Sequence, residues 1–249
     1  MKDKKDKKES RPGLSREAII TMAVKIVDEE GFPALSMRRL GAVLGVDPMA
    51  VYYHIPNKSA LLDGLVDQVM SEIDLSRDDP LKPAAERLRV AAHVYREVLL
   101  AHPNAMVVIA ARAPSTPVAF RPVELLLGIF LDAGFSATDA LAAVNIFARV
   151  VRGVVLTEVQ QVFGEGEMLK GGGSGARKKD SCDDSTCDAG CASPSVYLPP
   201  EEFPFMNEVM KKAVFIGFEE EFDRGVRALI RGLMETFANE QEESDSDAR

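Results

Sequence analysis

The chain has 249 residues, of which 46% are hydrophobic, so it can bury a full core in one large domain or two small ones. Its net charge is −9, but this charge is unevenly spread. Residues 1–60 carry 11 Lys and Arg against 8 Asp and Glu, a net charge of +3, whereas the other 189 residues carry 19 against 31, a net charge of −12. A basic end on an acidic body is typical of a protein that presents one end to phosphate groups.

Composition also limits where the protein acts. No apolar run approaches the roughly 20 residues of a membrane span, and the charged N-terminus lacks the apolar core of a signal peptide. The three cysteines form an odd-numbered cluster, which does not suggest the disulfide framework of a secreted protein. We therefore expect a cytoplasmic protein with no membrane partner.

The first 13 residues, MKDKKDKKESRPG, are highly charged, and we expect a disordered basic tail at 1–13. One interpretation is a solubilising tail. The other is an arm that touches phosphate or the minor groove of DNA, because five lysines would stand beside a nucleic-acid-binding domain.

Ser15 is a good N-cap for a first helix, which Gly31 ends, and apolar residues within it predict a broad buried stripe. The segment SMRRLGAVLGVDPMAVYYHIPNK then predicts two short helices joined by a tight turn. Ser36 caps the first, Gly45 stops it, and Asp47 caps the second, in which Pro48 takes the first position. This is the helix-turn-helix pattern, whose second helix enters the DNA major groove.

Residues 14–65 resemble the N-terminal domain of the TetR family of transcriptional regulators. The matching stretches are LSREAII, IVDEEGFPALSMRRLGAVLGV and AVYYHIPNKSALLDGL. A helix-turn-helix alone would be a weak signal, but the tract Tyr52-Tyr53-His54 followed by Pro56-Asn57-Lys58 makes the resemblance specific. It implies an all-α fold, with a three-helix DNA-binding domain at 14–60 on a larger helical domain at 61–240 that binds an effector and dimerises.

The resemblance and the pattern of exposed positions predict the DNA contacts. Arg38 is expected to contact a base or phosphate, and Arg39 either to do so or to be a solvated surface residue. Met49 and Ala50 could touch thymine methyl groups, and the hydroxyl groups of Tyr52 and Tyr53 could reach phosphates. The full set of expected contacts is Met37, Arg38, Arg39, Asp47, Pro48, Met49, Ala50, Tyr52, Tyr53, His54 and Lys58.

Beyond this domain, the periodicity predicts further helices. A connecting helix runs from Asn57 to about Leu75, and the resemblance implies that it moves when a ligand binds. The body helices are expected over 83–101, 105–111, 117–133, 137–163, 204–213 and 218–237. The helix at 137–163 is apolar on most sides, so it must be buried on several faces. The segment FEEEFDRGVRALIRGL resembles the final helix of family members with a tetracycline-repressor-like C-terminal domain, and this resemblance implies that the helices at 137–163 and 218–237 form a four-helix dimer interface.

Two segments lack apolar periodicity. Residues 164–199 are rich in Gly, Ser, Lys and Asp and predict a disordered loop, and residues 241–249 predict an acidic tail. The loop holds Cys182, Cys187 and Cys191, whose thiolates could bind a soft metal or sense oxidants. Their spacing matches no common zinc pattern and no histidine lies near, so an inert reduced loop is the other interpretation.

The predicted function is that of a homodimeric repressor that binds an inverted-repeat operator in double-stranded DNA and is released by a small-molecule inducer. The alternative is a thiol- or soft-metal-responsive repressor that uses the cysteine loop. We expect no enzymatic activity and no cofactor, because no reacting constellation stands out. Tetracycline-repressing members of the family use histidines to hold a drug-bound magnesium, but Asp74 and Val108 fall near those positions here. The candidate effector-binding residues are His93, His102, Met106, Ile109, Phe130, Asn145, Phe147, Arg149 and Glu158.

Overall fold

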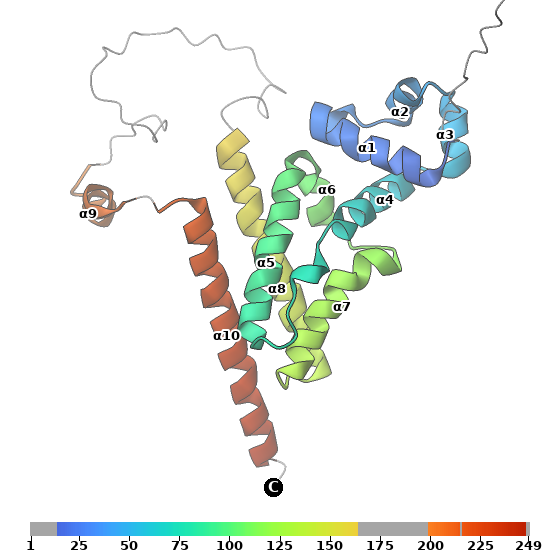
Figure 1. Cartoon of the computed structure of the whole chain (residues 1–249). Coiled ribbons are helices and arrows are strands. Elements are labelled where there is room, and N and C mark those ends of the chain that lie inside the picture. Colours follow the sequence, from blue (N-terminus) through green and yellow to red (C-terminus); the bar gives the residue numbers. More distant parts are fainter. Residues whose placement is uncertain (1–13, 164–198, 215, 248–249) are drawn as a thin grey trace, which may run out of the picture.

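The computed structural model in Figure 1 describes residues 14–163, 199–214 and 216–247. Every regular element in these ranges is a helix, and none of them is a strand, which confirms the predicted all-α class. The expected tail at 1–13 lies outside the described residues. So do Cys182, Cys187 and Cys191, together with all of the expected 164–199 loop except its last residue.

Helix α1 (Arg16–Glu30) begins and ends at the predicted residues. The Ser15 side chain accepts a hydrogen bond from the amide of Ala18 at 3.1 Å, which satisfies one of the free donors of the first turn. Gly31 ends the helix with φ at 84°, a region that favours glycine. The buried stripe of α1 forms the core of the N-terminal domain, and it consists of Ile19, Ile20, Ala23, Val24, Ile26 and Val27.

Helices α2 (Met37–Leu44) and α3 (Pro48–His54) form the predicted helix-turn-helix. Ser36 accepts from the amide of Arg39 at 3.1 Å, and Asp47 accepts from the amide of Met49 at 2.8 Å. Gly45 lies in the left-handed region at φ 68° and ψ 34°, as a C-terminal glycine should. Local capping chemistry therefore sets both ends of the turn.

Gly41, inside α2, allows the two helices to approach closely. A Cβ atom at this position would lie 3.0 Å from the carbonyl oxygen of Val46 and 3.2 Å from the nitrogen of Pro48. Both neighbours are backbone atoms at the start of α3, so a side chain could be accommodated only by moving α3.

Helix α4 (Lys58–Ser71) leads from the N-terminal domain into the body and is shorter than predicted. The Asp74 carboxylate accepts from the amide of Ser76 at 3.0 Å and from its hydroxyl at 2.6 Å. These bonds cap a 3₁₀ turn at Leu75–Arg77 in place of a continued α-helix, because a short polar side chain can offer the backbone an alternative partner.

The body is a bundle of α5 (Ala84–Ala101), α6 (Met106–Ala111), α7 (Pro117–Asp132), α8 (Ala137–Phe163) and α10 (Phe218–Asp247). Figure 1 shows α10 lying along α5 and α8. The first four helices begin and end within a residue or so of the expected positions, but α10 continues ten residues beyond the expected end at Phe237. The expected acidic tail at 241–249 is therefore largely helical.

The segment Ala137–Val159 of α8 is long and apolar enough to cross a membrane by length and composition alone, with a mean hydropathy of 1.6. The expectation that no apolar run approaches this length is therefore wrong. The reason is that α8 packs against α5, α6, α7 and α10, and a helix with several covered faces is apolar around most of its circumference.

Helix α9 (Pro204–Lys212) stands apart from the bundle in Figure 1. Its apolar side chains are exposed: Phe205 is 81% exposed and Val209 is 55% exposed.

Candidate DNA-binding surface and effector cavity

Helix α3 presents a mixed apolar and hydroxyl surface at the end of the molecule. Met49 is 72% exposed, Tyr53 is 87% exposed and Tyr52 is 42% exposed, whereas Val51 and Ile55 are fully buried. The buried pair attaches the helix to its domain and leaves the other side chains free to meet a partner. Asp47 is exposed, and Pro48, Ala50 and His54 are half-buried, so all the expected contacts on α3 reach the surface.

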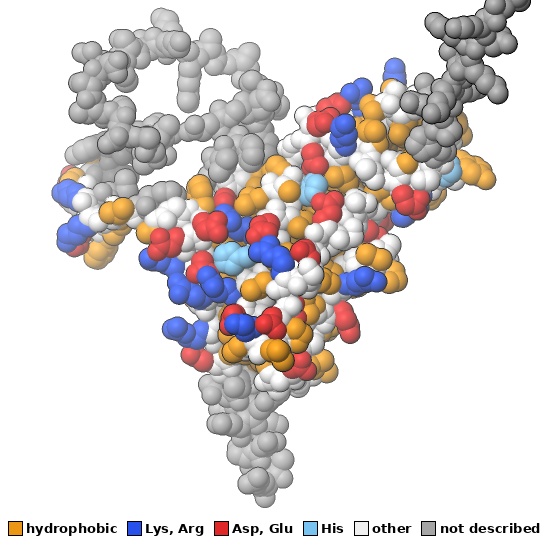
Figure 2. Space-filling view, in the orientation of Figure 1, with side chains coloured by type: hydrophobic (Ala, Val, Ile, Leu, Met, Phe, Trp, Pro, Cys, Tyr) orange, Lys and Arg blue, Asp and Glu red, His pale blue; other side chains and the backbone are white. Residues whose placement is uncertain are grey.

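The expected DNA contacts outside α3 differ in whether their side chains already have a partner within the protein. Arg38 is exposed on the first turn of α2. Arg39 instead makes a double hydrogen bond with Glu30, at 3.1 Å from Nε and 2.6 Å from Nη2, which favours its surface interpretation. Lys58 lies over the ring of Phe32, with Nζ 5.4 Å from the ring centroid, at the N-terminus of α4. Figure 2 shows that acidic side chains stand among the basic ones at this end of the molecule.

Met37 does not fit its predicted role. Its side chain is only 8% exposed and belongs to the core of the N-terminal domain. It follows the N-cap Ser36 directly, and the first turn of α2 rotates it inward toward α1. The expectation that Met37 contacts DNA therefore needs correction on grounds of burial.

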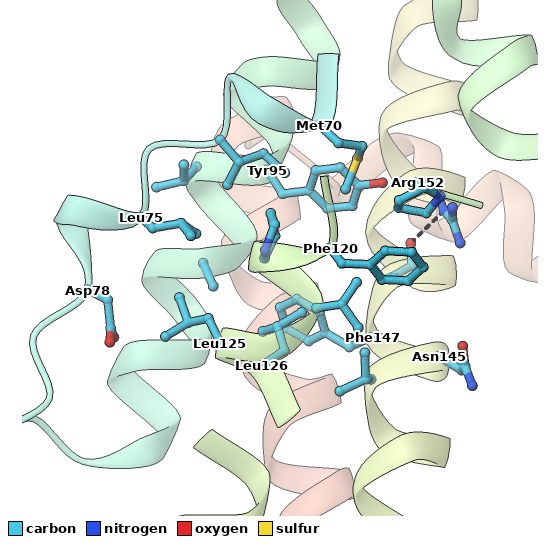
Figure 3. A pocket seen from close by; sticks show the side chains of 18 of the residues that line it. Met70, Leu75, Asp78, Tyr95, Phe120, Leu125, Leu126, Asn145, Phe147 and Arg152 are labelled. Atoms are coloured by element: carbon cyan, nitrogen blue, oxygen red, sulfur yellow. Dashed lines mark hydrogen bonds between the residues drawn. The ribbon is translucent and has the colours of Figure 1, made fainter. Parts of the chain in front are cut away.

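The body contains a cavity of about 270 Å³ between α4, α5, α7 and α8 (Figure 3). Its walls are mainly apolar, as in most small-molecule sites. Val66 and Met70 of α4 line it, so the helix that leads to the helix-turn-helix domain is itself part of the wall.

Three of the predicted effector residues line this cavity, namely Ile109, Asn145 and Phe147. Asp74, which the sequence resemblance singled out, also lines it. Val108 is 4% exposed and lies in the core, away from the cavity wall.

The structure places the other predicted effector residues elsewhere. Met106 and Phe130 are buried in the core, with 1% and 0% exposed, and Arg149 is exposed on α8. His93 Nε2 lies 3.0 Å from a carboxylate oxygen of Asp223, with its ring edge-on to Phe222. None of these four lines the cavity.

Glu158 is held by an arginine that sequence reasoning did not connect to it. Arg96 of α5 donates from Nε at 3.0 Å and from Nη2 at 2.6 Å, and both side chains are 9% exposed. The guanidinium also lies 5.2 Å from the ring centroid of Phe222 and 3.4 Å from Glu219, both on α10. This arrangement ties together α5, α8 and α10 and leaves Glu158 with a structural role.

His102 is likewise bound by carboxylates, and we call this arrangement the His102 bridge. Its Nδ1 lies 2.9 Å from Asp28 of α1, and its Nε2 lies 2.8 Å from Glu72 at the end of α4. Burial opposes protonation of the ring, but the hydrogen bonds and charges of the two carboxylates outweigh burial and raise the pKa of His102. The bridge therefore joins the N-terminal domain to the body through the His102 ring.

Several polar residues of the cavity were missed by sequence reasoning. They are Arg77, Asp78, Arg87, Tyr95, Arg112 and Arg152. Tyr95 is 7% exposed. Burial raises the pKa of its hydroxyl, and the charge of Arg152 opposes that rise. The available signal for Arg152 was an arginine within the apolar pattern of α8, a helix that also holds Arg149.

The loop between α6 and α7 connects the cavity to α4. Arg112, Ala113 and Pro114 line the cavity, and Arg112 forms an ion pair with Asp63 of α4. The carboxylate of Asp67, also on α4, accepts from the amide and the hydroxyl of Ser115, each at 2.7 Å. A displacement of this loop would therefore pull on α4.

Comparisons with known proteins agree with this arrangement. A family described as "Bacterial regulatory proteins, tetR family" matches residues 19–65, and "Tetracyclin repressor-like, C-terminal domain" matches residues 79–237. The class C tetracycline repressor protein of Escherichia coli is 33% identical over 147 residues, which cover 58% of this chain and 66% of that protein. An HTH-type transcriptional regulator of Saccharopolyspora erythraea is 32% identical over 156 residues, which cover 60% of this chain and 63% of that protein. The chain thus spans just under two thirds of the length of these two relatives.

Among solved structures, apo ActR from Streptomyces coelicolor superposes with a TM-score of 0.70 at 22% identity, covering 92% of this chain and 99% of ActR. This likeness supports the fold. The second family match alone covers more than half of the chain. The two matches together include the helix-turn-helix and the cavity-lining residues from Arg87 onward. The chain therefore belongs to the TetR family of bacterial regulatory proteins.

Proposed function

We propose that this protein is a homodimeric transcriptional repressor that binds an inverted-repeat operator and releases it when a small molecule occupies the body cavity. The observation that carries the proposal is the position of α4. One end of this helix joins the helix-turn-helix domain, and the same helix supplies Val66 and Met70 to the cavity wall.

Recognition of DNA would combine apolar and phosphate contacts. Met49 and Ala50 at the start of α3 can contact thymine methyl groups, and the hydroxyl groups of Tyr52 and Tyr53 can donate to phosphates. Arg38 and Lys58 add positive charge on either side of α3. Arg39 can contribute only if it leaves Glu30.

Release would follow from movement of α4. A ligand that binds better to one position of the 112–116 loop shifts the population toward that position, and only this difference in affinity can shift it. The bonds from Asp67 to Ser115 and from Arg112 to Asp63 carry the displacement to α4. A small tilt of α4 then moves α3 relative to its groove.

Dimerisation would bring two copies of α3 about 34–36 Å apart, the spacing of successive major grooves on one side of the duplex. The outer face of α8 supports this proposal, because Ile146, Val150 and Val154 are exposed at four-residue intervals. On α10, Gly225 and Gly232 face open space, so a second helix could approach closely. We propose a four-helix interface of α8 and α10 with their copies.

A regulatory role in the cytoplasm accounts for these features without an enzymatic activity. The alternative of a thiol- or soft-metal-responsive repressor depends on three cysteines outside the described residues, so the structure supplies no argument for it. Within the described part of the chain, no group of three or more His, Cys, Asp or Glu side chains is arranged to hold a metal ion.

Footprinting on the DNA that flanks the protein's own gene tests the proposal. We expect a protected inverted repeat whose affinity falls steeply with salt, because phosphate contacts release counterions. Tyr53→Ala should weaken protection, whereas Leu81→Ala, at a position 93% exposed before α5, should not. Absence of any protected repeat at low salt, or a monomer in sedimentation at working concentration, would contradict the proposal.

A further inference from the structure

Four arginines line the cavity, and three of them are neutralised. Arg77 forms an ion pair with Glu97 at 2.5 Å, Arg87 with Asp78 at 2.8 Å, and Arg112 with Asp63. The three carboxylates come from α4, α5 and the segment before α5. These three guanidinium groups are therefore already paired with carboxylates of the protein.

Arg152 of α8 is different. Among the described residues, no carboxylate lies within ion-pair distance of it. Its Nε donates to the carbonyl oxygen of Ala148 at 3.1 Å, and its Nη1 donates to that of Ile109 at 3.4 Å. Carbonyl groups orient the guanidinium but do not neutralise it. Since a guanidinium has five donors, most of its Nη donors remain available for a ligand.

The surroundings of Arg152 make an unneutralised charge costly. In Figure 3 the hydroxyl end of Tyr95 points toward Arg152 and the ring of Phe120 lies near them, while Phe147 lines the same cavity further away. Asp78 lies at the opposite side of the cavity and is itself bound to Arg87. A half-buried cation among apolar walls is poorly solvated. An anion that enters the cavity would therefore be stabilised both by the positive charge of Arg152 and by hydrogen bonds from its guanidinium.

We propose that the effector is an apolar molecule that bears a carboxylate, and that Arg152 binds this carboxylate while the aromatic and aliphatic walls enclose the rest. The inference deepens the proposed function and rests on the cavity being its effector site. The planar guanidinium can donate two parallel hydrogen bonds to a carboxylate, and the neutral hydroxyl of Tyr95 can donate a third.

The test compares two probes, a naphthoate and the naphthylmethanol with the same ring position, by calorimetric titration of the full chain. We expect the naphthoate to bind about tenfold more tightly or better, the ratio that a charge-assisted hydrogen bond typically contributes. Arg152→Gln should abolish this preference and leave the affinity for naphthylmethanol unchanged. Arg121→Gln is the matched control, because it removes a positive charge from an exposed position on α7 that does not line the cavity.

Equal affinities for the two probes in the wild-type protein would overturn the inference without recourse to any variant. A preference that persists in Arg152→Gln, or binding of neither probe, would overturn it as well. The operator footprint is measured separately. If the naphthoate preference depends on Arg152 but no repeat is protected, the repressor proposal fails and the carboxylate site stands. If the repeat is protected but the preference is absent, the carboxylate site fails alone.

Discussion

The ion pair between Arg96 and Glu158 provides the sharpest test of whether Glu158 has a structural role or binds the effector. Sequence reasoning predicted that Glu158 binds the effector, whereas the structure makes it the partner of Arg96 in the joint between α5, α8 and α10. Glu158→Gln keeps the shape of the side chain and removes its charge. The variant should therefore lose stability and keep its affinity for ligands.

The size of this loss follows from burial. Both side chains are only 9% exposed, so the guanidinium of Arg96 would remain buried opposite a neutral amide. Removing one partner of a buried ion pair costs about 3–5 kcal/mol. Glu219 lies 3.4 Å from Nη1 of Arg96 and can take over part of the compensation, but its side chain is 77% exposed, so we expect about 3 kcal/mol.

Thermal unfolding at a fixed protomer concentration measures the effect, since the proposed dimerisation would make stability depend on concentration. At about 2–4 °C per kcal/mol for a chain of this size, Glu158→Gln should lower Tm by about 6–12 °C. The matched control is Glu97→Gln, which removes the partner of Arg77 in a pair whose side chains are 43% and 57% exposed. Solvent screens such a pair, so Tm should barely change.

A double variant separates the stability lost through an unpaired buried charge from the net contribution of the ion pair to stability. Arg96→Met with Glu158→Leu should recover most of the lost stability, because apolar side chains of similar volume can replace a buried ion pair. A loss in Glu158→Gln no larger than that in Glu97→Gln would refute the reasoning. So would a loss of ligand affinity in Glu158→Gln with an unchanged Tm.

Three further variants test other parts of the structure. Gly41→Ala should cost about 1–3 kcal/mol and weaken operator binding in a mobility-shift assay, because its Cβ would press on the backbone at Pro48, whereas Gly128→Ala, with nothing within 4 Å, should not destabilise. The His102 bridge should stabilise the fold fully at pH values below the ordinary histidine pKa of about 6.5, and this stabilisation should be lost as pH rises through the raised pKa of His102 in the folded protein. Tm should therefore fall with rising pH in the wild type, and fall less in His102→Gln. Equal slopes of Tm against pH in the two proteins would count against this prediction. Asp67→Ala leaves the amide of Ser115 without its acceptor, so it should cost about 1–3 kcal/mol and reduce the effect of an effector on operator affinity. An undiminished effector response would show that the loop does not act through Asp67.

The helix-turn-helix could be predicted almost residue by residue, because its determinants are local. The hydrogen bonds that cap α1, α2 and α3 join residues two or three positions apart, and Gly45 takes a left-handed conformation that glycine favours. The apolar periodicity of the body likewise predicted the helices around the cavity, because the spacing of apolar residues along each helix is a local feature of the sequence.

The roles of individual polar side chains could not be predicted in this way, because their partners are distant in the sequence. Arg96 and Glu158 are 62 positions apart, His102 and Asp28 are 74 apart, and His93 and Asp223 are 130 apart. The sequence pattern around a titratable residue on an apolar helix is the same whether its side chain faces a ligand or a buried counter-ion. Sequence alone therefore determined the family of the protein and the bounds of its helix-turn-helix. Only the packing of α4, α5, α7 and α8 decided which charges are neutralised and which one, Arg152, faces the cavity without a carboxylate among the described residues.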